Sequence, residues 1–317
     1  MVGGDPGARG VVATASYEAR RFGIGSAMPA ARALRLCPHA VFLRPRFDVY
    51  RAVSKQVMDL LRLFTRMLQP LSLDEAFLDV SSVPFDSGEL LGRQIKCRIR
   101  EATALTASLG LAPNVLVAKV ASDIQKPDGL TLVPAGQEQN FLAPLPVRKL
   151  WGIGPQAEGR LRSSGIMTCG QLAQAEAASV VARFGQAGLE WQRLARGQDD
   201  RKVTSVWERR TLSRERTFAK DVAEREELHR IVAEIAEHVG EDLKEHRPAR
   251  TVTLKLRYAN FRTVTRGHSP GHVITAESLL LLSRWLLEKN WNGKPVRLLG
   301  IGVSNFLEGP EGQPALF

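Results

Sequence analysis

Apolar residues recur at three- and four-residue spacing in the first half of the chain, and this spacing predicts amphipathic helices. The segments with this spacing are residues 50–67, 90–103 and 114–124. Two short apolar runs lie between them and favour buried strands over residues 71–80 and 106–111. Because helices and strands alternate, we predict an α/β fold class with one mixed sheet for this part of the chain.

Glycines change the pattern in the middle of the chain. Residues 147–198 contain short apolar stretches separated by glycines, which predicts a small all-helical domain after a boundary near residues 134–146. Residues 199–220 are polar and mostly basic. This composition is typical of a tether that lies near phosphates and equally of a solvated linker, and both interpretations stay open.

A second α/β layer is predicted for the last third of the chain. Its expected helices are residues 224–244 and 276–287, and its expected strands are residues 251–258, a segment after Asn260, and residues 297–306. Apolar and polar side chains alternate in the first of these strands. The apolar face holds Val252, Leu254, Leu256 and Tyr258, and the polar face holds Thr251, Thr253, Lys255 and Arg257. Thr263, Thr265 and Arg266 are expected to extend the polar face, which can lie on DNA phosphates or simply face solvent.

The charge balance points to an anionic partner. The 317 residues include 44 Lys and Arg against 33 Asp and Glu, a formal net charge of +11. Such a surface attracts a polyanion, either nucleic acid or an anionic membrane face. No apolar run is long enough to span a membrane, and three distant cysteines indicate neither a disulfide framework nor a zinc site. We therefore expect a cytoplasmic protein.

An adjacent pair of acids, Asp74 and Glu75, is the first candidate for chemistry. Neighbouring side chains on a strand point to opposite faces, so both acids can serve one site only near a strand end or in a distorted stretch. The alternative is an exposed acidic turn without a chemical role. A second cluster changes this balance, and it consists of Thr14, Tyr17, Arg20 and Lys126. If residues 17–20 are helical, Tyr17 and Arg20 share a face and can contact phosphate oxygens together.

Glycines at residues 152 and 154 form the third candidate. They flank Ile153 and precede Pro155, so the backbone can approach a phosphate closely and offer amide donors at the start of the next helix. This pattern resembles a helix-hairpin-helix motif, which binds the DNA backbone without contacting bases. An ordinary glycine-rich turn between helices is the alternative.

Taken together, these motifs resemble those of the Y-family translesion DNA polymerases, in particular the DNA polymerase IV (DinB-like) branch. The resemblance rests on four stretches in the order and at the spacing of the family. They are Arg9–Arg20 with Gly23 and Ser26–Pro29, then Ser72–Asp79, then Ala118–Asp123 with Lys126–Gly129, and finally Trp151–Gly154.

The resemblance implies a right-hand polymerase made of several α/β and helical domains. The implied parts are small fingers (1–46), a palm (47–133), a helix-hairpin-helix thumb (134–198), a linker (199–210), a little finger (211–306) and a tail (307–317). In the family's pattern Asp74 and Glu75 are the catalytic, metal-ligating acids for two Mg²⁺ ions. Thr14, Tyr17, Arg20 and Lys126 fall on positions that contact the incoming triphosphate. The implied activity is error-prone, lesion-bypassing DNA synthesis on primer-template DNA by a monomer.

One departure from the family concerns the amino terminus. The family opens with a strand that carries another metal-ligating aspartate and is followed by an aromatic steric gate, and neither matches this sequence. We favour a start codon placed too far downstream, because Asp74, Glu75, Arg20 and Lys126 all persist. The alternative is an inactive relative that binds primer-template DNA and the sliding clamp, and a helix-hairpin-helix repair nuclease is a weaker hypothesis.

The carboxyl-terminal residues carry one further pattern. Gln313 followed by Leu316 and Phe317 resembles the peptide by which bacterial proteins bind the sliding clamp, with two apolar side chains in a pocket. The resemblance therefore implies a clamp as a partner.

Overall fold

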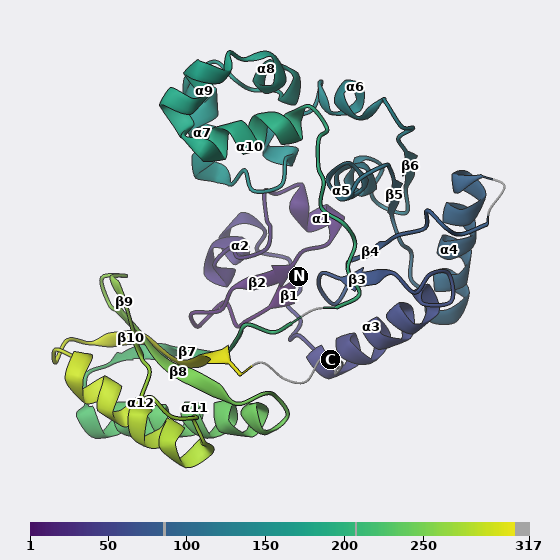
Figure 1. The fold of residues 1–317 in the computed structure, drawn as a ribbon. Coiled ribbons are helices and arrows are strands. Elements are labelled where there is room, and N and C mark those ends of the chain that lie inside the picture. The colour runs from purple at the N-terminus through teal and green to yellow at the C-terminus, as the bar shows by residue number, and fades with distance from the viewer. Residues whose placement is uncertain (85–86, 207, 308–317) are drawn as a thin grey trace. The chain divides into compact units, whose positions relative to one another are not determined.

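The computed structural model describes residues 1–84, 87–206 and 208–307. It divides into two compact units, Met1–Arg46 with Trp207–Phe317, and Phe47–Val206 (Figure 1). Within the described ranges, no helix combines the length and apolar character needed to cross a membrane.

The described residues in the first part of the unit Phe47–Val206 form three helices and two pairs of strands. The elements are α3 (Phe47–Leu61), β3 (Leu68–Pro70), β4 (Ala76–Leu78), α4 (Gly88–Thr103), β5 (Leu109–Leu111), α5 (Val115–Ile124) and β6 (Leu130–Leu132). The β3–β4 pair is antiparallel and the β5–β6 pair is parallel. The three predicted helices are confirmed. They form because their apolar positions share one face, and Ser87 and Asn114 cap the amino ends of α4 and α5.

Three sequence predictions for this region are wrong. The expected strand over residues 71–80 is interrupted, because residues 71–75 form the turn that joins β3 to β4. The strand expected over residues 106–111 covers only Leu109–Leu111. Among the described residues the strands form two separate pairs rather than one mixed sheet, and β6, which the apolar pattern did not reveal, pairs with β5.

Helices follow one another from residue 138 to residue 195, which confirms the helical character predicted for residues 147–198. The elements are α6 (Glu138–Leu142), the 3-10 turn η1 (Val147–Lys149), α7 (Pro155–Ser163), α8 (Cys169–Gln174), α9 (Ala177–Phe184) and α10 (Gln186–Ala195). Their core is not self-contained, because Leu116, Val117 and Val120 of α5 are buried in the same hydrophobic cluster as Leu142 and Leu161. Helix α5 therefore belongs to the core of the helical part as much as to the strands beside it.

A strap of chain, residues 197–204, strengthens this attachment. The Asn114 side-chain amide donates to the carbonyl of Gly197 (2.8 Å), and the backbone amide of Leu116 donates to the Asp199 carboxylate (3.1 Å). Arg201 donates two hydrogen bonds to the same carboxylate, at 2.7 and 2.8 Å. Further along, the Thr204 amide donates to the Gln69 side chain. The strap thus ties the end of the helical part to the start of α5 and to β3.

The amino-terminal part of the other unit is small. Strands β1 (Val2–Gly3) and β2 (Val12–Thr14) pair in antiparallel fashion, and helices α1 (Tyr17–Arg20) and α2 (Ala30–Leu36) follow. A compact cluster fills the space between them and includes Val12, Ala15, Ile24, Ala33 and Cys37. Because Val12 is buried and its neighbours in β2 are exposed, this cluster leaves Thr14 at the surface.

The carboxyl-terminal part is an antiparallel sheet in the order β7-β10-β8-β9 with two helices packed on one face (Figure 1). The elements are β7 (Thr211–Val222), α11 (Arg225–Lys244), β8 (Ala249–Tyr258), β9 (Thr263–His268), α12 (Ala276–Asn290) and β10 (Val296–Phe306). The predicted helices and strands of this layer are confirmed. The alternation in β8 is confirmed as well, since its apolar face is buried and its polar face is partly exposed.

Strand β7 corrects the interpretation of residues 199–220 as a tether, because Thr211–Val222 pairs with β10 along the sheet. The charged sequence concealed it. Arg214 and Arg216 share the helix-facing side with buried Leu212 and pair with Asp242 and Glu234 of α11. Arg266 is also placed differently from the prediction, since it lies opposite Leu254 and therefore on the helix-facing side of the sheet.

We predict that Asp199→Ala destabilises the unit Phe47–Val206 by about 2–3 kcal/mol in urea unfolding, because it leaves a buried amide and a cation without their acceptor. The Asp199 side chain is 0% exposed. Asp200→Ala is the matched control, since the Asp200 side chain is 89% exposed and pairs only at the surface with Arg193. An equal effect of both substitutions would contradict the role of the strap.

The same interaction predicts a pH dependence. Burial raises the pKa of the Asp199 carboxyl, but hydrogen bonds from Arg201 and Leu116 outweigh burial and hold the pKa below its ordinary value. A depressed carboxyl pKa stabilises the fold above the unfolded-state pKa, and this stabilisation is lost as the pH falls through the folded-state pKa. The stability difference between the native chain and Asp199→Ala should therefore shrink below a pH of about 4.

Candidate active site and nucleic-acid interface

The adjacent acids Asp74 and Glu75 lie in the turn between β3 and β4, and both are exposed. The amides of Leu71 and Ser72 both donate to the Glu75 carbonyl, at 2.8 and 3.2 Å, and so close the turn. The Ser72 hydroxyl donates to the Asp74 carboxylate at 2.6 Å. Because the backbone is turned rather than extended here, the two carboxylates are released from the opposite-face geometry of a strand.

Lys119 is a site residue to which the sequence analysis gave no role. It lies on α5, and its ammonium group is 2.9 Å from the Glu75 carboxylate. The same ammonium lies 5.8 Å from the centroid of the Trp151 ring, and Phe77 of β4 packs against that ring at 6.1 Å between centroids. One signal could have revealed it, because Lys119 is a lone cation in the apolar run Val115–Ala121.

Lys126 follows the carboxyl end of α5 and pairs with Asp123 at 2.6 Å. It shares the unit Phe47–Val206 with Asp74 and Glu75. The Lys126 and Asp123 side chains are each 41% exposed, so this ion pair is accessible to solvent and can exchange for another anion.

Thr14, Tyr17 and Arg20 lie together in the other unit, at the surface. Thr14 ends β2, and Ser16 caps the short helix α1 that carries Tyr17 and Arg20. The predicted shared face is confirmed, because the Arg20 guanidinium carbon lies 5.1 Å from the centroid of the Tyr17 ring. The Nε of Arg20 also donates to the Ala15 carbonyl at 3.0 Å, a hydrogen bond that does not use the two terminal nitrogens of the guanidinium group.

The glycines of the predicted helix-hairpin-helix form the turn before α7. Gly152 has a φ of +91°, a backbone conformation that residues other than glycine rarely adopt. Gly154 occupies the N-cap of α7 without a side-chain capping bond, and Pro155 follows at the first helical position. Ile153 between the glycines is buried and fixes the turn to the core. The first amides of α7 are therefore free of side-chain caps at an exposed helix amino end, where an anion binds favourably.

The polar face of the sheet carries Thr251, Thr253, Lys255 and Arg257 on β8. Lys255 reaches across the position of Gly300 in β10 to pair with Glu215 of β7 at 2.6 Å. A Cβ atom added at Gly300 would lie 2.9 Å from the Glu215 Cβ, so only glycine leaves the space that the Glu215 side chain occupies. Arg257 donates to the Thr263 hydroxyl of β9. The face thus combines hydroxyls and glycines with Lys255, Arg257 and the acid Glu215.

No group of three or more His, Cys, Asp or Glu side chains that could hold a metal ion occurs in the described ranges. The acid pair nevertheless suits magnesium, which binds oxygen and commonly takes one or two protein carboxylates together with substrate phosphates and water. Asp74 and Glu75 supply two carboxylates that solvent reaches.

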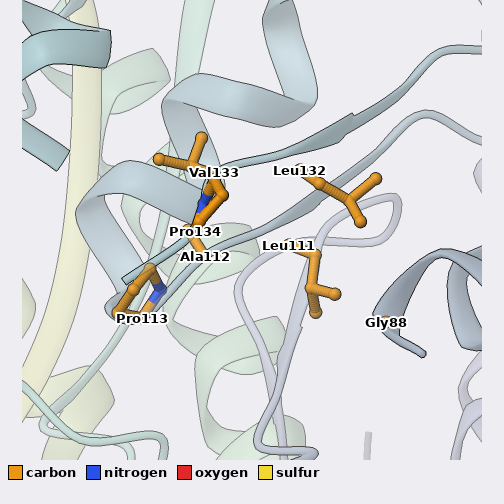
Figure 2. A pocket seen from close by; sticks show the side chains of 7 residues that line it. All are labelled: Gly88, Leu111, Ala112, Pro113, Leu132, Val133 and Pro134. Carbon is orange, nitrogen blue, oxygen red and sulfur yellow. The ribbon is translucent and has the colours of Figure 1, made fainter. Parts of the chain in front are cut away.

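A pocket of about 270 Å³ lies elsewhere, beside the ends of β5 and β6 (Figure 2). Figure 2 shows that its lining is aliphatic, with Leu111 and Leu132 near Gly88 at the start of α4. A lining without a charged or hydroxyl side chain offers nothing to orient a phosphate. This pocket is therefore separate from the candidate chemistry.

Gln313, Leu316 and Phe317, the predicted clamp-binding residues, lie outside the described residues.

Comparisons with known proteins match nearly the whole chain. A model described as the impB/mucB/samB family matches residues 1–123, one for the C-terminal domain of that family matches residues 209–316, and one for the IMS family HHH motif matches residues 136–166. The chain is 46% identical to a DNA polymerase IV of Alkalilimnicola ehrlichii, over 97% of this chain and 88% of the relative. It is 45% identical to a DNA polymerase IV of Halorhodospira halophila, over 96% and 87% of the two chains.

Solved structures give the same result. A Y-family DNA polymerase chimera of Dbh and Dpo4 superposes with a TM-score of 0.86 at 26% identity, covering 97% of this chain and 92% of the chimera. An insertion ternary complex of Dbh DNA polymerase gives a TM-score of 0.65 at 25% identity, with 95% and 89% covered.

We predict that Gly152→Ala lowers the free energy of unfolding by about 1–2 kcal/mol, because alanine is strained at a positive φ. Gly159→Ala is the matched control. Gly159 lies exposed inside α7 with nothing within 4 Å of an added Cβ, so this substitution should stabilise the helix by about 0.5–1 kcal/mol. Thermal unfolding of the two variants tests the difference in sign, and a stabilising Gly152→Ala would refute the strained turn.

Proposed function

The chain belongs to the impB/mucB/samB family, in the DinB-like branch of the Y-family DNA polymerases, and we propose that it extends a primer on a DNA template and copies past damaged bases. The observation that carries the proposal is the exposed acid pair of the β3–β4 turn, within a chain that its DNA polymerase IV relatives match almost end to end. The reaction joins the primer 3′ oxygen to the α-phosphorus of a deoxynucleotide and releases pyrophosphate.

In this proposal Asp74 and Glu75 would hold two divalent metal ions, both of them magnesium. When bound, such ions lower the pKa of the primer hydroxyl and neutralise charge on the leaving pyrophosphate. The chain's own residues orient the two acids. Ser72 restrains the Asp74 carboxylate through its hydroxyl, and Lys119 restrains the Glu75 carboxylate through its ammonium group.

The incoming triphosphate is assigned to Thr14, Tyr17, Arg20 and Lys126. A guanidinium group offers several donors in a fixed plane, and a phenol and a hydroxyl add single donors, so together they fit the oxygens of a triphosphate. The contact between Arg20 and the Tyr17 ring limits the freedom of both side chains before the nucleotide arrives. Lys126 would exchange its surface pair with Asp123 for a phosphate.

Two surfaces are proposed to hold primer-template DNA. The glycines at residues 152 and 154 would let the backbone amides of the thumb turn approach one phosphate group, and Thr251, Thr253, Lys255 and Arg257 would contact others from the sheet. Hydroxyls, amides and cations position a duplex without distinguishing bases, as an enzyme that must accept any template requires.

Further parts of the proposal concern partners and place of action. Gln313, Leu316 and Phe317 would bind a bacterial sliding clamp, and the protein would act in the cytoplasm as a monomer. The net charge of +11 supports binding to DNA, since a basic surface attracts a polyanion.

Asp74→Asn should lower magnesium-dependent primer extension by more than about 100-fold. Replacing a residue that only hydrogen-bonds to a metal ligand commonly lowers activity by about 10–100-fold, and replacing a ligand itself should cost more. Asp59→Asn is the control, since Asp59 is an exposed acid on α3 that pairs with Lys55 and Arg62 of the same segment. Gel-based extension of a labelled primer measures both. Full activity of Asp74→Asn would refute the proposal, and shortening of the labelled strand without nucleotide addition would favour a nuclease.

Lys255→Ala and Arg257→Ala should each weaken binding to primer-template DNA and reduce the slope of log affinity against log salt concentration by about 1. Arg225→Ala is the control, because Arg225 pairs with Glu288 of α12 on the helix side of the sheet. Fluorescence anisotropy across a salt series tests this, and unchanged slopes for Lys255→Ala and Arg257→Ala would remove the sheet from the interface.

A further inference from the structure

Trp151 lies where three segments of the unit Phe47–Val206 meet. The guanidinium carbon of Arg201 is 4.4 Å from the ring centroid, and the ammonium of Lys119 is 5.8 Å from it. Phe77 of β4 packs against the same ring. The indole is 40% exposed and is therefore not a core residue that packing alone explains. It joins the strap, helix α5 and the strand that follows the acid pair.

Each of the two cations at the ring is also paired with an acid. Arg201 is paired through two hydrogen bonds with the buried carboxylate of Asp199, which also accepts from the first turn of α5. Lys119 is paired with Glu75. The ring thus contacts both an arginine that the strap fixes and a lysine that also pairs with a proposed catalytic acid.

A lysine side chain has about four rotatable bonds, and it loses much rotamer freedom when it is held in one conformation. The ring of a tryptophan attracts an ammonium electrostatically and limits the orientations open to it. Without the ring Lys119 keeps its charge but regains this freedom, and Glu75, which is exposed, is held less firmly. Small misplacements of a catalytic group lower turnover more than they lower binding.

We propose that Trp151 is a positioning residue that holds Lys119 against Glu75 and thereby couples the DNA-binding turn of the thumb to the acid pair of the palm. Trp151 directly precedes Gly152, so a phosphate bound at this turn acts on a backbone that is continuous with the residue holding Lys119. The inference rests on the proposed function of Glu75 and of the glycine turn.

The test is a double-mutant cycle of Trp151→Ala and Lys119→Met, with Trp151→Phe as the conservative variant. Trp285→Ala is the matched control, because Trp285 is 42% exposed and carries Lys289 at 4.8 Å from its ring centroid. Steady-state extension should show kcat about tenfold lower for Trp151→Ala, with the KM for the deoxynucleotide and the metal-free affinity for DNA within about twofold. Lys119→Met should lower kcat by at least as much.

The double variant should be no slower than Lys119→Met, since Trp151 acts through Lys119. Trp151→Phe should recover most of the lost turnover, because an aromatic ring is retained, and Trp285→Ala should leave turnover unchanged. A readout independent of activity is urea unfolding of the metal-free protein. There the Trp151–Lys119 cycle should give a coupling of about threefold in the unfolding equilibrium, and a Trp151–Lys55 cycle should give none.

Three results would overturn the inference: effects of the two substitutions that multiply in the double variant, a Trp151→Phe enzyme as slow as Trp151→Ala, or lost DNA affinity with normal kcat. The last would make Trp151 a DNA contact instead. Failure of the proposed function is distinguishable, because it appears as undiminished extension by Asp74→Asn whatever the cycle gives.

Discussion

The packing of α5 into the core of helices α6–α10 is the constraint on which the unit Phe47–Val206 depends. Leu116, Val117 and Val120 are buried together with residues of these helices, so α5 and the helices after it share one hydrophobic cluster. The strap adds polar contacts at the amino end of the same helix, where the buried Asp199 carboxylate joins a helix amide to Arg201. Apolar burial supplies the stabilisation, and the buried carboxylate fixes one arrangement, because each of its hydrogen bonds would be costly to lose.

This arrangement explains how one helix can serve two surfaces. The apolar side of α5 faces helices α6–α10, while Lys119 on the same helix reaches the turn of the β3–β4 pair and contacts Glu75. The turn before α7 returns to the same place through Trp151. Helix α5 and the Trp151 ring therefore connect the β3–β4 turn with the turn before α7.

The sheet of the carboxyl-terminal part separates its charges by face. On the helix side, arginines pair with acids of α11, so their charge is largely compensated and helps to fix the helix on the sheet. On the open side, hydroxyls and glycines dominate, and Lys255 and Arg257 are held by Glu215 and Thr263. Glycine at residue 300 leaves the space in which Lys255 of β8 pairs with Glu215 of β7 across β10.

Local patterns in the sequence determined helices α3, α4 and α5, the helical part that follows them, the alternation in β8 and the shared face of Tyr17 and Arg20, because each depends on neighbours a few residues apart. The sequence motifs also identified the family. Tertiary structure decided what depends on distant partners. The turn at residues 71–75 forms because β3 and β4 pair, and β7 is a strand because it pairs with β10, while acids of α11 compensate its arginines. The contact of Lys119 with Glu75 and Trp151 joins residues far apart in the chain, and only the packing of α5 brings them within reach.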